Sequence, residues 1–231
     1  MSKAPLESSK NGKTRILLAT GNPAKQATLQ WLLEDLPLET VTPGELGLTS
    51  VPDEEGETHQ AIARQKAGAW SRAASMLVIA SDGGLIIPAL GANWESRFTH
   101  RFAGADAGDR DRLRSLLELM RPYRGAEREA SWIEAVAIAD QGRVLTSWEL
   151  TGATGLIADV SSKGPGENLA KDPAVEGFWV FSVWRFPKFG KYYNQLTEAE
   201  RQSLDDHWTQ LRVRVQRYFQ KEFQHPYPPS A

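Results

Sequence analysis

Four charged residues of this 231-residue chain have the types needed for chemistry on a phosphate group: Lys25, Glu54, Lys66 and Asp82. Glu54 and Asp82 can hold magnesium, which takes one or two carboxylates together with phosphate oxygens of a substrate. The two lysines would neutralise phosphate charge, and a carboxylate would orient a water for attack. Each residue also has a plainer interpretation, because acidic residues before a helix favour its dipole, aspartates cap turns, and lysines often lie on solvated faces.

The stretch 18–25, Leu-Ala-Thr-Gly-Asn-Pro-Ala-Lys, is predicted to form a tight polar turn between a strand and a helix. An apolar run precedes it, and leucines at helical spacing follow it. Gly21 relieves the backbone of the turn, and Asn22 can cap the helix, whose first turn suits the next residue, a proline. The exposed amides would bind a phosphate, with Thr20 adding a hydroxyl and Lys25 a charge. The alternative is an ordinary turn, since the glycine spacing of the P-loop and of dinucleotide sites is missing.

A second polar stretch, Ser81-Asp82-Gly83-Gly84, follows the apolar run 76–80. We predict that a strand ends with this run and that Asp82 lies in the turn after it. Gly83 and Gly84 would let backbone or ligand approach closely. A carboxylate at a strand end of an α/β sheet lies where ligands usually bind. The alternative is an aspartate that only caps the turn.

The composition excludes several kinds of site. The chain has no cysteine, so disulfides, thiolate metal sites and cysteine nucleophiles are excluded. Its four histidines are scattered and show no metal-ligand spacing. The net charge is −2, and no basic stripe or arginine-rich helix is present, so we expect no binding to a nucleic acid polymer.

We expect a cytoplasmic protein without a membrane partner. No apolar run approaches the ~20 residues that a membrane span requires. The first residues, 1–13, are polar and lack the apolar centre of a signal peptide. The hydrophobic fraction of 41% permits a core.

Helical and strand patterns alternate along the rest of the chain. Beyond the helix that follows the turn at 20–25, we predict helices over 58–74, 108–120 and 197–219. The predicted strands cover 37–41, 76–80, 85–90, 131–140, 143–150 and 152–160, with a hairpin turn at Gln141-Gly142. The loop 161–176 is long for a compact domain, so we expect it to be functional.

These elements predict an α/β fold with an elongated mixed β-sheet and flanking helices. We expect a single domain over residues 14–222, between a disordered tail, 1–13, and a proline-rich tail, 223–231. The alternative is two lobes with a cleft between them.

Six short motifs resemble those of the inosine triphosphate pyrophosphatase family, in the same order, over residues 15–211. The first three are Ala19-Thr20-Gly21-Asn22-Pro23-Ala24-Lys25, similar to ATGNxxK; Glu54-Glu55-Gly56-Glu57-Thr58 with Lys66-Ala67, similar to ExGxT…KA; and Ala80-Ser81-Asp82-Gly83-Gly84-Leu85, similar to ADDSGL. The others are Thr99-His100-Arg101-Phe102-Ala103-Gly104, similar to SARYxG; Gly152, Gly155 and Ile157, similar to GxxGxI; and Gly190-Lys191 with Leu196-Thr197-Glu198-Ala199-Glu200-Arg201, similar to GK…ELTxEEK.

This resemblance implies a fold and an activity. The family has an elongated mixed sheet with two lobes around a central nucleotide cleft, and its members are usually homodimers. It hydrolyses nucleoside triphosphates to monophosphate and pyrophosphate, which removes deaminated purines such as those of inosine and xanthosine.

The resemblance also implies catalytic roles. Asp82, Lys25 and Lys66 would be the catalytic residues, with the two lysines in contact with the phosphates. Glu54 and Asp82 would ligate Mg²⁺, and Asp82 would also orient or activate the attacking water.

A larger set of residues is predicted to bind the substrate. Its members are Thr20, Gly21, Asn22, Lys25, Gly83, Gly84, Phe178, Arg201 and His207. Within this set, Phe178 would stack on the base, and Arg201 and His207 would offer hydrogen-bond donors to the nucleotide.

The chain departs from the family mainly in the half that reads the base. In the phosphate half, Ser81 replaces the first aspartate of ADDSGL, and Ala61-Ile62 stand where many members have Glu-Asn. The family's GFGYDP corresponds to residues 177–182, preceded by a longer loop than is usual, so Phe181 stands in place of the base-pocket aspartate. The family's SHR corresponds to Asp205-Asp206-His207. Because carboxylates only accept hydrogen bonds, we expect that inosine triphosphate is not the best substrate.

Our first hypothesis is therefore a Mg²⁺-dependent nucleoside triphosphate pyrophosphatase with altered base preference. The second is a non-catalytic nucleotide-binding or sensor module on the same fold. A structural or dimerisation protein that uses its aromatic surface is a third, but it gives no reason for the charged turns.

Overall fold

The computed structural model describes residues 13–48, 56–104, 106–159, 179–204 and 206–224. These residues form an α/β fold with a seven-stranded mixed sheet in the order β2-β1-β3-β4-β5-β6-β7, and the predicted mixed sheet with flanking helices is thereby confirmed. The strands are β1 (Thr14–Leu18), β2 (Leu38–Val41), β3 (Leu77–Ile86), β4 (Glu129–Asp140), β5 (Arg143–Ile157), β6 (Trp184–Phe186) and β7 (Lys191–Tyr192). The α-helices are α1 (Pro23–Leu32), α2 (His59–Ala74), α3 (Asp109–Met120), α4 (Glu198–Gln202) and α5 (His207–Gln224).

The chain divides into two compact units. The first comprises Met1–Asp82, Ala135–Glu149 and Trp208–Ala231, and the second comprises Gly83–Glu134 and Leu150–His207. Strands β3, β4 and β5 each contribute residues to both units.

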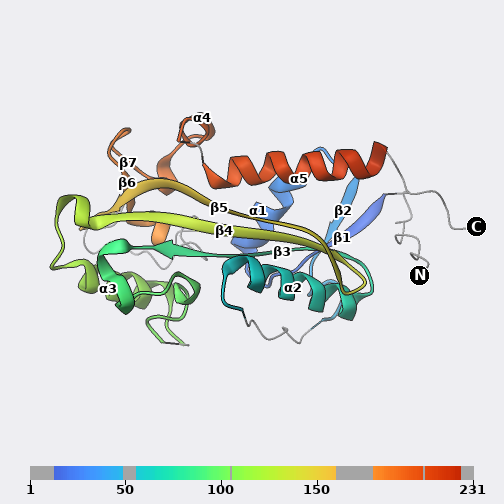
Figure 1. Cartoon of the computed structure of the whole chain (residues 1–231), viewed down its shortest axis with the longest axis horizontal. Helices are drawn as coiled ribbons and strands as arrows, with labels where there is room; N and C mark the ends of the chain where they lie inside the picture. The colour runs from blue at the N-terminus through green and yellow to red at the C-terminus, as the bar shows by residue number, and fades with distance from the viewer. Residues whose placement is uncertain (1–12, 49–55, 105, 160–178, 205, 225–231) are drawn as a thin grey trace, which may run out of the picture. The chain divides into compact units, whose positions relative to one another are not determined.

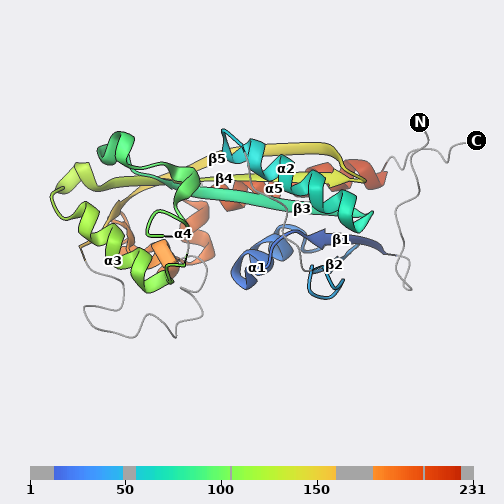
Figure 2. The same cartoon turned by 90° about the horizontal axis from the view of Figure 1, so that it is seen from below.

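The first unit is built on parallel strands. β1 pairs in parallel with both β2 and β3, and the three strands lie side by side (Figure 2). Helix α2 covers one face of this part of the sheet and α5 the other (Figure 1). The core under α2 is made of small and branched side chains from α2, β1, β3 and β4, among them Leu17, Ala63, Ala67, Val78 and Ala137. Small residues let the helix approach the sheet closely.

Helix α5 has an apolar stripe that packs in the first unit. Trp208, Leu211, Val215 and Phe219 recur at helical spacing and are all buried. On its partly exposed side the Arg212 guanidinium lies over the α1 ring of Trp31, 4.6 Å from the centroid. None of the helices in the described part of the chain is both long and apolar enough to cross a membrane.

The hairpin between β4 and β5 forms at the predicted position. Gln141 and Gly142 both have positive φ, 47° and 83°, as the two-residue turns that suit twisted hairpins require. The Gly142 amide also donates to the Ser71 hydroxyl of α2 at 2.8 Å. This hydrogen bond ties the turn to the end of the helix that lies beside it.

The second unit has an aromatic core. The rings of Phe181, Trp184, Phe186 and Tyr193 are all buried and pack on one another, with centroids 4.5 Å apart between Phe181 and Tyr193. Trp132 of β4 meets Phe181 edge to face at 5.3 Å. Such pairs add stability beyond the apolar area that they bury.

Four predicted boundaries are wrong. The strand predicted over 85–90 is not a separate strand, because β3 includes its first residues and ends at Ile86, and Pro88–Asn93 forms a 3₁₀ helix. β3 does not end at Ala80 but runs through the glycines to Ile86, so the predicted turn there does not form. The strands predicted over 143–150 and 152–160 are one strand, β5. The helix predicted over 197–219 is two helices, because the chain leaves α4 at Ser203 and buries the side chain of Asp206 before α5 begins.

Candidate functional site

The turn after β1 forms the helix start that the sequence predicts. The Asn22 side chain caps α1 and accepts from the amides of Ala24 at 2.9 Å and Lys25 at 3.3 Å. The Thr20 hydroxyl accepts from the Asn22 amide at 3.1 Å and keeps its own proton for donation. Two of the amides expected to meet a phosphate are thus engaged by the cap. The Thr20 hydroxyl and the Lys25 ammonium can still meet an anion at this turn.

The strand register brings this turn beside the Ser81–Asp82 segment. β1 and β3 are parallel, Leu18 is paired with Ile79, and the Ala19 amide donates to the Ile79 carbonyl at 2.9 Å. β1 ends at Leu18, whereas β3 continues. The chain that leaves β1 therefore lies next to Asp82. This place is the carboxyl end of β1, and ligands of α/β sheets bind at the carboxyl ends of strands.

Helix α2 and strand β3 present a shared face that changes from apolar to polar along its length. Val78, Ala80 and Asp82 alternate onto one face of β3, because side chains along a strand repeat every two residues. On α2, the residues at helical spacing that face the sheet are His59, Ala63, Lys66, Ala67 and Trp70, all of which are buried. The first of these, His59, meets the end of the β3 series at Asp82.

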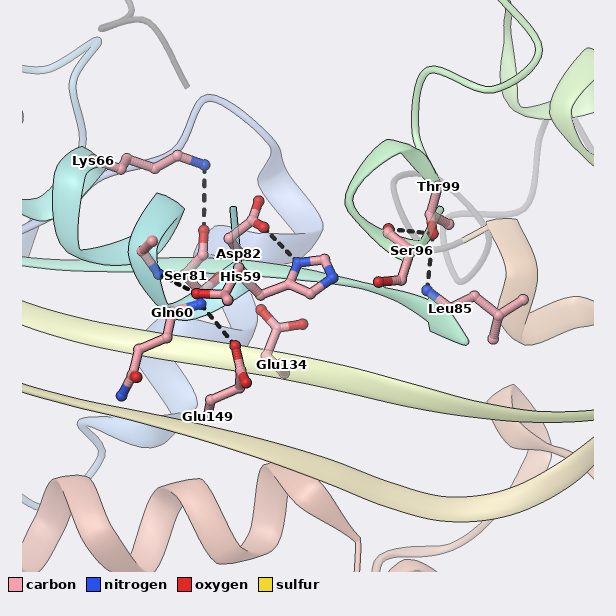
Figure 3. Close-up of polar contacts among 12 residues, drawn as sticks. His59, Gln60, Lys66, Ser81, Asp82, Leu85, Ser96, Thr99, Glu134 and Glu149 are labelled. Atoms are coloured by element: carbon pink, nitrogen blue, oxygen red, sulfur yellow. Dashed lines mark hydrogen bonds and ion pairs between the residues drawn. The ribbon is translucent and has the colours of Figure 1, made fainter. Parts of the chain in front are cut away.

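A close pair of side chains occupies this junction. His59 Nδ1 lies 2.6 Å from Asp82 Oδ2, and both residues are buried. A carboxylate can only accept a hydrogen bond, so His59 Nδ1 carries the hydrogen and donates it. The ammonium of Lys66 donates to the Ser81 carbonyl at 3.3 Å and lies on the same side of β3 as the Asp82 carboxylate (Figure 3).

The surroundings of Asp82 keep it ionised. Burial raises the pKa of Asp82. The hydrogen bond from His59 and the positive charges of Lys25 and Lys66 together lower it by more than burial raises it, so the pKa is below its ordinary value. A perturbed carboxylate with specific charged partners is typical of functional sites. The two lysines that the sequence predicts thus act electrostatically on the predicted carboxylate.

Sequence reasoning missed His59. The four histidines of the chain are scattered, and His59 has no other histidine at metal-ligand spacing. The available signal was its place in the helix pattern, since residue 59 falls on the same helical face as Ala63, Ala67 and Trp70. A histidine on the core-facing stripe at a helix start must find a polar partner in the sheet beneath it.

The close approach predicted at Gly83 and Gly84 is made by neighbouring groups of the protein, and both glycines lie in strand β3 and not in a turn. A Cβ on Gly83 would overlap the Glu134 carboxylate, and a Cβ on Gly84 would overlap the backbone carbonyl of Ser96. The loop that carries Ser96 is held against β3 because the Leu85 amide donates to the Thr99 hydroxyl at 2.9 Å (Figure 3). The absence of side chains at both glycines is thus explained by close packing within the second unit, and their contact with a substrate stays a prediction.

The other predicted site residues are distributed as follows. Glu54, Phe178 and Asp205, with the loop 161–176, lie outside the described residues. Gly21 is exposed in the turn after β1. Arg201 and His207 belong to the second unit, whereas the phosphate-site residues belong to the first.

A buried polar cluster in the second unit contains His207. The Tyr193 hydroxyl donates to Asp206 Oδ1 at 2.5 Å, and His207 Nδ1 lies 3.5 Å from the same oxygen. Burial lowers the pKa of His207 to about 4, although the Asp206 charge raises it, so the ring is neutral at pH 7. Gly152 of β5 leaves room for this ring, with a Cβ position only 3.1 Å from its Cγ. The Arg201 guanidinium covers the Tyr193 ring at 5.4 Å and donates to the Leu196 carbonyl at 3.1 Å.

The chemistry of Asp82 fits a magnesium ligand. It is an ionised carboxylate beside two cationic side chains, as a site for magnesium and phosphate oxygens requires. Within the described residues, no group of three or more acidic or histidine side chains is placed to hold a metal. This fits magnesium sites in which substrate phosphates also bind the ion, because such sites use only one or two protein carboxylates.

Comparisons with known proteins agree with one another. The model of the Ham1 family matches residues 16–166. A dITP/XTP pyrophosphatase of Rhodopseudomonas palustris is 30% identical over 194 residues, which cover 82% of this chain and 85% of that protein. One from Pectobacterium atrosepticum is 29% identical over 199 residues, 86% of this chain and 95% of that protein.

Solved structures show the same fold. The chain is similar to a HAM1 protein from Coxiella burnetii with a TM-score of 0.70, at 24% identity, over 90% of this chain and 98% of that one. It is similar to the Ham1 protein of Staphylococcus aureus with a TM-score of 0.67, at 23% identity, over 90% and 99% of the two chains. At these identities the likeness concerns the fold.

Proposed function

Since this chain belongs to the Ham1 family, as its motifs predict, we propose that it is a nucleoside triphosphate pyrophosphatase that requires Mg²⁺. The reaction consumes one water and one nucleoside triphosphate and gives the monophosphate and pyrophosphate. The relatives named dITP/XTP pyrophosphatases support this class of reaction. The observation that carries it is the ionised Asp82 beside Lys25 and Lys66, next to the turn after β1.

Each of these residues has a part in the proposed reaction. Lys25 and Lys66 bind the phosphates and balance the charge that develops on the leaving pyrophosphate. Asp82 orients the attacking water and accepts its proton as the α–β phosphoanhydride bond breaks. The Thr20 hydroxyl donates to a phosphate oxygen.

Asp82 and Glu54 are the proposed protein ligands of Mg²⁺. When bound, the ion supplies charge neutralisation to the triphosphate, which lowers the barrier to attack by water. Chelation of Mg²⁺ with EDTA should abolish pyrophosphate release, and added Mg²⁺ should restore it.

Homodimer formation and a cytoplasmic location also remain predictions.

Replacing Lys25 by alanine should weaken the binding of a triphosphate more than that of a monophosphate. Lys25 stands one turn into α1, where it meets phosphate charge that the monophosphate lacks. A lost charge-assisted hydrogen bond predicts a Kd for the triphosphate that is about 10–100-fold higher. Calorimetry measures both ligands, and Lys221→Ala removes an exposed charge elsewhere in the first unit as the control. Equal losses for the two ligands would contradict this placement of Lys25.

The proposed enzyme has an altered base preference. By the motif match, Phe181, Asp206 and His207 stand where the family reads the base. Phe181 is buried among aromatic rings, and the Asp206 carboxylate is buried and accepts from Tyr193. A carboxylate offers no donor to the carbonyl of hypoxanthine. We therefore propose that a base with an amino group, or one with added apolar bulk, is preferred.

A panel of substrates tests both the activity and the preference. Pyrophosphate release is measured with Mg²⁺ for inosine, xanthosine, guanosine, adenosine and cytidine triphosphates and their deoxy forms. We expect at least one amino-bearing base to exceed inosine triphosphate in kcat/KM. A preference of about tenfold or more for inosine or xanthosine triphosphate over all the others would reject the altered preference and leave the activity standing.

The alternative function is a nucleotide-binding module without turnover. Bound nucleotide with no pyrophosphate released from any member of the panel would favour it. The retention of Lys25, Lys66 and the ionised Asp82 supports the enzyme, because binding alone does not need a carboxylate that repels phosphate.

A further inference from the structure

We propose that His59 is a positioning residue for Asp82: it holds the Asp82 carboxylate in one orientation so that one oxygen faces the reacting groups. This inference rests on the proposed function, because it assigns Asp82 a part in the reaction. It adds a residue to the site that none of the sequence motifs assigns.

The first support is the geometry of the pair. His59 Nδ1 donates to Asp82 Oδ2 at 2.6 Å, which is in the range of strong charge-assisted hydrogen bonds. The contact takes one carboxylate oxygen and thereby restricts rotation about the Cβ–Cγ bond of Asp82. In Figure 3 the other oxygen points away from His59, on the side of β3 where the Lys66 ammonium lies.

The second support is the rigidity of the element that carries His59. His59 is the first residue of α2, which Thr58 caps by accepting from the Ala61 amide at 3.0 Å. The next residue, Gln60, donates its amide to the Glu149 carboxylate of β5 at 2.8 Å. The helix start is thus fixed to a neighbouring strand, and the imidazole that it carries is fixed with it.

The third support is the cost of the pair. A histidine and a carboxylate that are buried together lose their hydration, and their mutual attraction offsets this free-energy cost only in part. Apolar side chains of similar size usually stabilise a packed interface as well or better. The neighbouring positions on the same faces of the helix and the strand are apolar: Ala63 and Ala67 on α2, and Val78 and Ala80 on β3. A polar pair that ends an apolar series, at the carboxylate where two lysines act, indicates a role in orienting that carboxylate.

Two substitutions separate the hydrogen bond from packing. His59→Phe keeps a planar ring and removes the donor, whereas His59→Asn keeps a donor near the position of Nδ1. For His59→Phe we expect kcat to fall about 10–100-fold with KM changed by less than about threefold. His59→Asn should recover most of the lost kcat. Gln60→Ala, in the same helical turn, is the matched control and should keep the kcat of the unchanged protein.

Crystal structures of the unchanged protein and of His59→Phe give a readout without activity. We expect a single orientation of the Asp82 carboxylate in the former and a rotated or divided one in the latter. An unchanged carboxylate in His59→Phe, full kcat in that variant, or equal kcat in the Phe and Asn variants would each overturn the proposal. If the unchanged protein hydrolyses no triphosphate, the proposed function fails, and the crystal comparison still decides whether His59 orients Asp82.

Discussion

Replacing Asp82 by asparagine should lower kcat about 10²–10⁴-fold, because the variant loses the group that accepts the proton of the attacking water. Asparagine has nearly the same size and its side-chain oxygen can still accept from His59, so the local packing is retained. The carboxylate is ionised in the folded chain, since His59, Lys25 and Lys66 outweigh the effect of burial on its pKa. The amide carries no such charge at any pH.

The control for this prediction is the same chemical change at an exposed position. Asp111 of α3 is exposed and pairs with the exposed Arg114 in its own helix, so Asp111→Asn should keep full kcat. Steady-state kinetics with saturating Mg²⁺ and the best triphosphate measure both variants. An Asp82→Asn enzyme that keeps more than about a tenth of the kcat would show that this carboxylate has no chemical role.

The phosphate half of the site was predictable because its signals are local. Asn22 followed by proline is a helix start in sequence and in the structure, and the capping bonds form as that pattern requires. The apolar run before Asp82 correctly predicted a strand there, but the predicted end of that strand at Asp82 was wrong, because β3 continues to Ile86. Lys25 and Lys66 were found through their charge, and both act on Asp82.

The His59–Asp82 pair was not predictable by the same means. The two residues are 23 positions apart, and only the packing of α2 on β3 brings them together. The helical stripe identifies His59 as core-facing, but no local pattern identifies which strand residue it meets. The Tyr193–Asp206–His207 cluster has the same origin, because it joins a short 3₁₀ segment to the start of α5.

The Gly83–Gly84 pair was wrongly placed in a turn, although the close approach predicted there is found, because glycine has two physical uses. As a turn residue it supplies unusual backbone angles, and as a strand residue it leaves space for a neighbour. Neither Gly83 nor Gly84 has positive φ, and β3 continues through both. Gly84 has no side chain, and the Ser96 carbonyl occupies the space that a Cβ would fill. A single sequence does not distinguish these uses, since the neighbour comes from a loop that lies later in the chain.

This packing role predicts that Gly84→Ala lowers the free energy of unfolding by about 3 kcal/mol, the upper part of the range for overpacked cores. The added Cβ would overlap the Ser96 carbonyl and lie 2.9 Å from the Thr99 hydroxyl. Backbone cannot swing aside as a long side chain does. The loop is also held to β3 by the hydrogen bonds from the Leu85 amide to Thr99 at 2.9 Å and from the Trp94 indole to the Leu85 carbonyl at 2.6 Å. The clash therefore has to break one of these contacts or bend the strand.

Gly44→Ala is the matched control, because a Cβ at Gly44 meets nothing within 4 Å and φ there is not positive. Chemical denaturation of the two variants and the unchanged protein gives the comparison, and Gly44→Ala should stay within about 0.5 kcal/mol of the unchanged protein. If β3 bends, Asp82, two residues earlier in the same strand, moves with it, and kcat of Gly84→Ala should fall as well. Equal stability of the Gly84→Ala and Gly44→Ala variants would mean that the loop carrying Ser96 is not held against β3, and the glycine would again need an explanation from its backbone or from a ligand.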